Sequence, residues 1–258
     1  MAKTDLAQIA YTYRHLSSNI DDEDFKSFIK SCIEYADKTK SQNFQDVFAL
    51  HCARRLQVYP KNYYFVEIGA TNGVDGSNTF MLENNESLKE SWRGILVEPN
   101  DEYFNEMKKN RSHLSCYFDS RCVYNKSGET VDFLITDEPD LSCIKEYSQS
   151  DEHAVKRNNV KKVLQKKTIT LYDLLEQYNI PNERINYLSI DTEGSELMIL
   201  EKFFDENKNK YRIDTITVEH NYVADKRDKL ARLLNQNNYI RVFPEMSRWD
   251  DFYVINTV

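Results

Sequence analysis

Apolar residues recur at helical spacing in the first part of the chain. Residues 5–15 and 24–35 carry them three and four positions apart, and a third run extends from 41 to 56. Acidic residues at 21–24 precede the second run, and negative charge favours a helix N-terminus. The pattern therefore predicts a helical N-terminal extension over residues 1–58.

From Tyr63 onward, short continuous apolar runs alternate with helical stretches. Runs without strict alternation are typical of parallel strands covered on both faces. The expected strands are 63–70, 94–98, 185–190, 213–218, 239–243 and 251–255, and the expected helices are 102–109, 171–178, 197–204 and 228–235. The alternation predicts an open, doubly wound α/β sheet over residues 59–258.

A turn at 125–130 separates two short apolar runs, 122–124 and 131–134, and predicts a β-hairpin. The segment that follows, 137–167, is polar and rich in basic residues. Two interpretations are open for it: a site for the diphosphate of a nucleotide-activated sugar, or a solvated helix face. The basic residues are Lys156, Arg157, Lys161, Lys162, Lys166 and Lys167.

Composition narrows the class of protein. The 34 Lys and Arg against 42 Asp and Glu give a net charge of −8, which argues against a nucleic-acid partner. The 5 cysteines form no C-x-x-C pair, so reduced thiols are favoured over disulfides or structural zinc. No apolar run approaches the roughly 20 residues of a membrane span, and the N-terminus lacks a signal-peptide core. We expect a cytoplasmic protein.

Two strand ends carry residues suited to a nucleoside cofactor. The first expected strand contains Glu67 and runs into a glycine turn at 69–73, and the second ends at Glu98. A carboxylate at a strand end can accept both ribose hydroxyls. A dinucleotide fingerprint would have glycine where Thr71 stands, and the P-loop lysine is missing. A plain turn and a solvated acid remain the alternatives, but the pair suits a cofactor with a ribose and a cationic amino-acid end.

Several motifs in order resemble the FkbM family of S-adenosylmethionine-dependent methyltransferases. The resemblance runs from about residue 41 to the C-terminus and leaves 1–40 outside it. The motifs are Ser41-Gln-x-x-Gln-Asp46, Val66-Glu-Ile-Gly-Ala-x-x-Gly73, Ser77-Asn-Thr79, Trp92-x-Gly-Ile-Leu-Val-Glu-Pro-Asn100, Leu188-Ser-Ile-Asp-Thr-Glu-Gly-Ser-Glu-Leu197 and Val218-Glu-His-Asn221.

This resemblance implies a Rossmann-like class I methyltransferase fold, a mostly parallel seven-stranded sheet with one reversed strand and helices on both faces. It implies S-adenosylmethionine as cofactor, with the methionine part near Glu67, Gly69 and Gly73, the ribose on Glu98, and the adenine near 119–122. The expected cofactor-binding residues are Ser41, Gln42, Glu67, Gly69, Ala70, Gly73, Ser77, Glu98, Pro99, Asp119, Ser120 and Cys122.

Two further strand ends supply candidate catalytic groups. Ser195 and Glu196 are explained as the cap and first turn of a helix. That leaves Asp191, Glu193, Glu219, His220 and Asn221, which adjacent strand ends would bring together. A sugar hydroxyl is a poor nucleophile, so a general base or a metal is expected.

The roles within this cluster stay open at this point. His220 has the unperturbed pKa best suited to a base, and Glu193 is the alternative. Asp191 and Glu219 have two possible roles: they bind a divalent cation, Mg²⁺ or Mn²⁺, or they orient the acceptor. The sequence leaves the metal requirement open. We assign Asp191, Glu193, His220 and Asn221 as the catalytic candidates.

The expected activity is O-methylation of a sugar hydroxyl. A nucleotide-activated sugar, such as a heptose or deoxysugar for bacterial surface polysaccharide or glycoside biosynthesis, is the favoured acceptor, and 248–251 offers an aromatic ring and carboxylates to it. Methylation of a non-sugar metabolite and a non-catalytic cofactor-binding role are the alternatives. The first 40 residues are expected either to cap the site or to form an oligomer contact.

Overall fold

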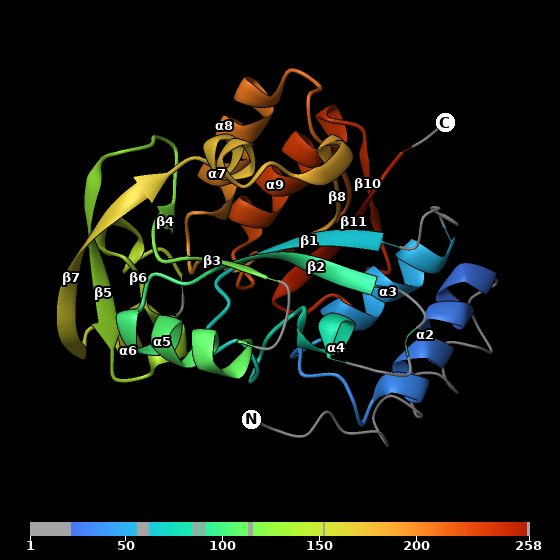
Figure 1. Cartoon of the computed structure of the whole chain (residues 1–258), viewed down its shortest axis with the longest axis horizontal. Helices are drawn as coiled ribbons and strands as arrows, with labels where there is room; N and C mark the ends of the chain where they lie inside the picture. Colours follow the sequence, from blue (N-terminus) through green and yellow to red (C-terminus); the bar gives the residue numbers. More distant parts are fainter. Residues whose placement is uncertain are drawn as a thin grey trace.

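The computed structural model describes residues 22–55, 62–84, 88, 91–112, 116–151 and 153–256. Its centre is a seven-stranded sheet (Figure 1). In spatial order the strands are β3 (Tyr117–Asp119), β2 (Ser91–Val97), β1 (Asn62–Ile68), β8 (Arg184–Ile190), β9 (Arg212–Glu219), β11 (Asp250–Ile255) and β10 (Tyr239–Val242). β11 runs antiparallel to both of its neighbours, β9 and β10, and the other pairs in this sheet are parallel. The predicted α/β class and the single reversed strand are confirmed.

Helices cover both faces of this sheet and make two apolar cores (Figure 1). One face carries α7 (Leu171–Tyr178), α8 (Glu196–Asn207) and α9 (Ala224–Gln236); the other carries α2 (Glu23–Tyr35), α3 (Gln45–Arg55), α4 (Phe80–Glu83) and α5 (Asp101–Asn110). Successive strand residues face opposite sides, so Phe65 enters the second core and Val66 the first. All but the first residue of β1 are buried, which is why its sequence shows no alternation.

The N-terminal helices share the core of the sheet. The Asp22 carboxylate caps α2 by accepting from the amides of Asp24 and Phe25. Phe28 on that helix stacks on Phe243, with ring centroids 4.7 Å apart. The helix predicted over 5–15 and the boundary at 58–59 lie outside the described residues, and an oligomer contact through this region stays a prediction. No helix in the described ranges is long and apolar enough to cross a membrane.

A second sheet is inserted between β3 and β8. Its order is β4 (Cys122–Val123), β7 (Val160–Ile169), β5 (Thr130–Thr136) and β6 (Cys143–Ile144). The predicted hairpin is wrong, because β7 lies between its two strands, parallel to β4 and antiparallel to β5. The helix-face interpretation also fails over 160–169, which is a mostly exposed strand. Three 3₁₀ turns, η1 (Pro139–Leu141), η2 (Lys145–Tyr147) and η3 (Pro181–Glu183), and the short α6 (Ala154–Arg157) complete the fold.

Candidate active site

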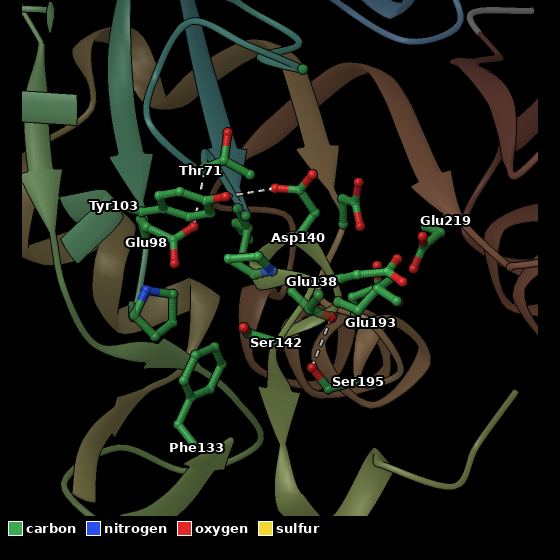
Figure 2. Close-up of a pocket in the computed structure, with 18 of the residues that line it drawn as sticks. Thr71, Glu98, Tyr103, Phe133, Glu138, Asp140, Ser142, Glu193, Ser195 and Glu219 are labelled. Carbon is green, nitrogen blue, oxygen red and sulfur yellow. Dashed lines mark hydrogen bonds between the residues drawn. The ribbon is translucent and has the colours of Figure 1, made fainter. Parts of the chain in front are cut away.

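A cleft of about 810 Å³ opens at the carboxyl ends of β1, β2, β8 and β9. The second sheet forms its other wall through Phe133, the 137–142 turn, Ile144 and His153. Figure 2 shows Glu98, Tyr103 and Asp140 toward one end of this cleft and Glu193, Ser195 and Glu219 toward the other. The strand ends at which an open parallel sheet binds its ligand therefore face one cleft.

The glycine turn after β1 brings two strand ends together. A Cβ on Gly69 would lie 1.8 Å from the backbone oxygen of Asp191, and Gly69 has a φ of +88°. Only glycine meets both demands without strain. Gly73 serves a different contact, because its Cβ would lie 2.8 Å from Met107 on α5. The turn thus places the end of β1 directly against the start of the acidic loop after β8.

Glu98 lies at the end of β2 and lines the cleft. Its two carboxylate oxygens accept from the amide of Thr71 at 2.9 Å and the amide of Asn100 at 2.7 Å. Burial raises the pKa of this carboxyl to about 7. Nearby, the Tyr103 hydroxyl donates to Asp140 at 2.9 Å, which links α5 to the second sheet across the cleft (Figure 2).

Glu67 does not line the cleft. It is 1% exposed, and its carboxylate accepts from the amide of Asn78 at 2.6 Å and from the hydroxyls of Ser77 and Thr79. Its carboxylate therefore holds the turn over 77–79 in place. The expected position of Glu67 beside the methionine part of the cofactor stays a prediction, because these contacts of its carboxylate are all within the protein.

Other expected cofactor residues have internal partners. The Ser41 hydroxyl donates to Asp46 at 2.8 Å near the start of α3. Asp119 pairs with Arg121 at 2.5 Å and accepts from the Tyr178 hydroxyl at 3.1 Å. Of the twelve cofactor candidates, the cleft lining includes Gln42, Gly69, Glu98, Pro99 and Cys122; it does not include Ser41, Glu67, Ala70, Gly73, Ser77, Asp119 or Ser120.

Three carboxylates form the acidic edge of the cleft, which we define as Asp191, Glu193 and Glu219. One oxygen from each lies within 4.8 Å of the others. Burial and the neighbouring acids raise the pKa values of Asp191 and Glu219 well above the ordinary range, and burial raises the pKa of Glu193 to about 7. Glu219 is 5% exposed, and its buried Oε2 has no hydrogen-bond partner among the described residues. Such an arrangement is suited to taking up a proton or a cation.

The loops that present this edge have unusual backbone conformations. Glu193 and Asn221 have φ values of +59° and +48°, in the left-handed region. The Asn221 amide donates to Glu193 at 3.1 Å and to Asp151 at 3.2 Å. Non-glycine residues held in this region gather at functional sites.

The structure places His220 outside the lining of the cleft in which it was expected to act as a base. Its ring is 0% exposed and does not line the cleft. Its Nδ1 accepts from the Tyr222 amide at 3.1 Å, and its Nε2 lies 3.7 Å from the Asp251 carboxylate. The imidazole therefore faces Asp251 on β11, and Glu193, the alternative base, is the candidate that lines the cleft.

Several residues of the site were not singled out for it by the sequence. Arg157 is fully buried and pairs with Asp151 and Glu193, although it belongs to the basic stretch. Ser195 sits at the cap position of α8 without capping it; its hydroxyl donates to Thr192 at 2.8 Å, and it lines the cleft. The helix cap was a sufficient explanation of Ser195 from sequence, and no spacing signal connects 157 to 193.

Of the other five basic residues of the stretch, none lines the cleft and three make ion pairs. Lys156 pairs with Glu138, Lys161 with Asp137 and Lys166 with Asp101. The described lining contains no Lys or Arg, but it contains the carboxylates of Asp75, Glu98, Asp137, Glu138, Asp140, Asp191, Glu193 and Glu219. This lining complements a cationic or neutral ligand and does not offer a diphosphate site.

The model of the methyltransferase FkbM domain matches residues 67–250 of the chain, which span the whole acidic edge. The chain belongs to the FkbM methyltransferase family. This FkbM methyltransferase is therefore S-adenosylmethionine-dependent. A cofactor that carries a sulfonium and an ammonium group fits the carboxylate-lined cleft and its glycine turn.

A comparison with solved structures matched other methyltransferases. They are the ribosomal protein L11 methylase from Lactobacillus delbrueckii subsp. bulgaricus (10% identity, TM-score 0.38, covering 83% of this chain and 79% of that one), a human methyltransferase 10 domain containing protein (11%, 0.44, 98% and 97%) and the METTL16 MTase domain (12%, 0.42, 97% and 91%). A comparison with curated proteins gave no match.

Proposed function

We propose that this protein transfers the methyl group of S-adenosylmethionine to a hydroxyl oxygen of a sugar. The observation that carries the proposal is the adjacency of the glycine turn and the acidic edge, joined where Gly69 meets the Asp191 backbone. A donor methyl bound at the turn would face carboxylates able to orient an acceptor and take its proton.

In this proposal Glu193 is the general base. Both hydrogen bonds to its carboxylate from described residues are accepted by Oε2, from Arg157 and Asn221. Glu193 lines the cleft, and its pKa of about 7 lies near the optimum for proton transfer at neutral pH. When bound, the cofactor supplies an electrophilic methyl group. Glu193 then accepts the hydroxyl proton as the acceptor oxygen bonds to that methyl and the carbon–sulfur bond breaks.

Aromatic side chains favour a sugar as the acceptor. Trp249 lines the cleft, and Tyr222 packs edge-on against it with centroids 6.3 Å apart while remaining 55% exposed. Such rings offer an apolar surface with a polar tip at an open rim. Because the described residues that line the cleft include no Lys or Arg, the phosphates of a nucleotide-activated sugar would have to lie beyond this lining. The acceptor panel should therefore contain free and glycosidic sugars beside nucleotide-activated heptoses and deoxysugars of surface polysaccharide biosynthesis.

A divalent cation at the acidic edge is a second element of the proposal. Asp191 and Glu219 would supply hard oxygen ligands, because one oxygen of each lies within 4.8 Å of the other, and the unpartnered Glu219 Oε2 would gain a partner. Mg²⁺ or Mn²⁺ held there would lower the cost of gathering three acids and would polarise an acceptor oxygen.

Location in the cytoplasm also belongs to the proposal. All five cysteines are free in the structure, as expected of a reducing compartment.

Methyl transfer to a panel of acceptors tests this function directly. We expect release of S-adenosylhomocysteine with at least one sugar, and we expect a chelator to suppress it if the acidic edge holds a metal. Turnover only with non-sugar metabolites would replace the acceptor class. Tight cofactor binding with no turnover on any acceptor would favour a binding protein instead.

Glu98 gives a pH-dependent prediction for cofactor binding. Its pKa of about 7 means that the carboxylate needed by a ribose becomes protonated as the pH falls below 7. The dissociation constant of S-adenosylmethionine should then rise, approaching tenfold per pH unit. Calorimetry from about pH 5.5 to about pH 8.5, roughly 1.5 units on either side of this pKa, measures the change. Glu98→Gln should bind weakly and without that slope, whereas an unchanged slope in Glu98→Gln would assign it to another group.

A further inference from the structure

The buried Arg157 connects the second sheet to the acidic edge. It lies at the end of α6 and is 1% exposed. Its guanidinium contacts Asp151 through both terminal nitrogens, at 2.6 and 3.0 Å, and its Nε donates to the Leu141 carbonyl at 3.1 Å. The same group also donates to Glu193. One residue of the insertion therefore holds two carboxylates, one of which faces the cleft.

These contacts close into a ring. Asn221, after β9, donates to both carboxylates that Arg157 holds, Asp151 and Glu193. Four side chains from three separate parts of the chain thus fix one another, and Glu193 sits in the ring with a left-handed backbone. The bidentate contact with Asp151 fixes the plane of the guanidinium, and one of its terminal nitrogens then donates to Glu193 Oε2 in a set direction, which restricts where that oxygen can point.

Close packing at Gly194 also holds the loop of Glu193 against the insertion. A Cβ on Gly194 would lie 2.5 Å from the Tyr147 Cβ and 2.9 Å from the Ser150 hydroxyl oxygen. The loop that carries Glu193 is therefore pressed against the segment 147–151 of the insertion. The arginine and the loop it contacts are held in register by this close approach.

We propose that Arg157 is a positioning residue for methyl transfer, which orients the Glu193 carboxylate toward the acceptor and makes the inserted sheet part of the active site. This rests on the proposed role of Glu193 as the base. Arg157 acts through Glu193 and does not itself line the cleft. A residue of this kind contributes by holding a near-attack geometry, to which turnover is sensitive.

A double-mutant cycle tests this inference. Arg157→Gln should lower kcat by about 100-fold with little change in cofactor affinity, and Arg157→Lys should recover part of the loss. In the Glu193→Gln background, Arg157→Gln should cause no further loss, because its route to the reaction is already removed. Lys162→Gln is the control, an exposed basic residue on β7 of the same insertion that should leave kcat unchanged.

The outcomes separate the two proposals. If Glu193→Gln loses turnover but the fold losses in kcat of the two substitutions multiply in the double variant, Arg157 has an independent or merely structural role. The inference about Arg157 then fails while the assignment of Glu193 as the base stands. If Glu193→Gln keeps full activity, the base assignment fails first. Thermal melting accompanies each variant, and Asp151→Asn in both Glu193 backgrounds replaces Arg157→Gln if the latter does not fold. Asp151→Asn should likewise cause no further loss of kcat in the Glu193→Gln background, and fold losses that multiply would overturn the inference.

Discussion

Glu193→Gln should lower kcat by about 10²–10⁴-fold, the range expected for loss of a general base, without a measurable change in S-adenosylmethionine affinity. The amide keeps the shape of the side chain but cannot accept the acceptor's proton. The cofactor contacts that we propose, at Gly69 and Glu98, belong to other strand ends. Steady-state kinetics with an accepted sugar and calorimetry with the cofactor measure the two halves of this prediction.

Glu138→Gln provides the comparison for that variant. Glu138 also lines the cleft, but it belongs to the second sheet and pairs with Lys156 near the surface. Its turnover should stay close to that of the parent protein. Equal losses in both variants would mean that total negative charge matters, and full activity in Glu193→Gln would remove Glu193 from the chemistry.

Gly69→Ala should destabilise the fold by roughly 3 kcal/mol or more and abolish cofactor binding. The added Cβ would lie 1.8 Å from the Asp191 backbone oxygen, between two paired central strands that cannot easily separate. Separating them would also move the acidic edge away from the glycine turn. Thermal or denaturant unfolding and cofactor titration measure the two effects.

Gly128→Ala is a matched control for Gly69→Ala. Its φ of +82° is close to the +88° of Gly69, but a Cβ there would meet nothing within 4 Å. It should cost only the left-handed conformational strain of about 1 kcal/mol. The difference between the two variants isolates the steric contact at the β1–β8 junction, and similar stability losses would disprove that contact's importance.

Most of the central sheet was predictable because its inner strands are buried on both faces and appear as continuous apolar runs, as in β1. The short edge strand β3 was not predicted, because it has three residues and only one of them is buried. The second sheet was not, because β7 exposes most of its residues and has lysines at four of its ten positions. A strand of that composition resembles a solvated helix face, and its pairing with β4 and β5 depends on contacts distant in sequence.

The same physical difference separates the parts of the site. The acids that follow β8 and β9 could be found because parallel strands end at a common edge. Alternation along an extended chain places Glu219 and His220 on opposite sides, so that one faces the cleft and the other faces Asp251. The sequence alone did not tell which of the two sides would be the cleft. Arg157 reaches Glu193 only through tertiary packing of the insertion.

The central claim is that the cleft joins a methyl donor to a sugar oxygen at the acidic edge. The most direct measurement supplies S-adenosylmethionine with a ¹³C-labelled methyl group and follows the label by NMR in the acceptor panel. We predict a new O-methyl resonance on a sugar with the parent protein and none above background with Glu193→Gln. A label found on nitrogen or carbon, or no transfer to any sugar while the cofactor is bound, would contradict the account.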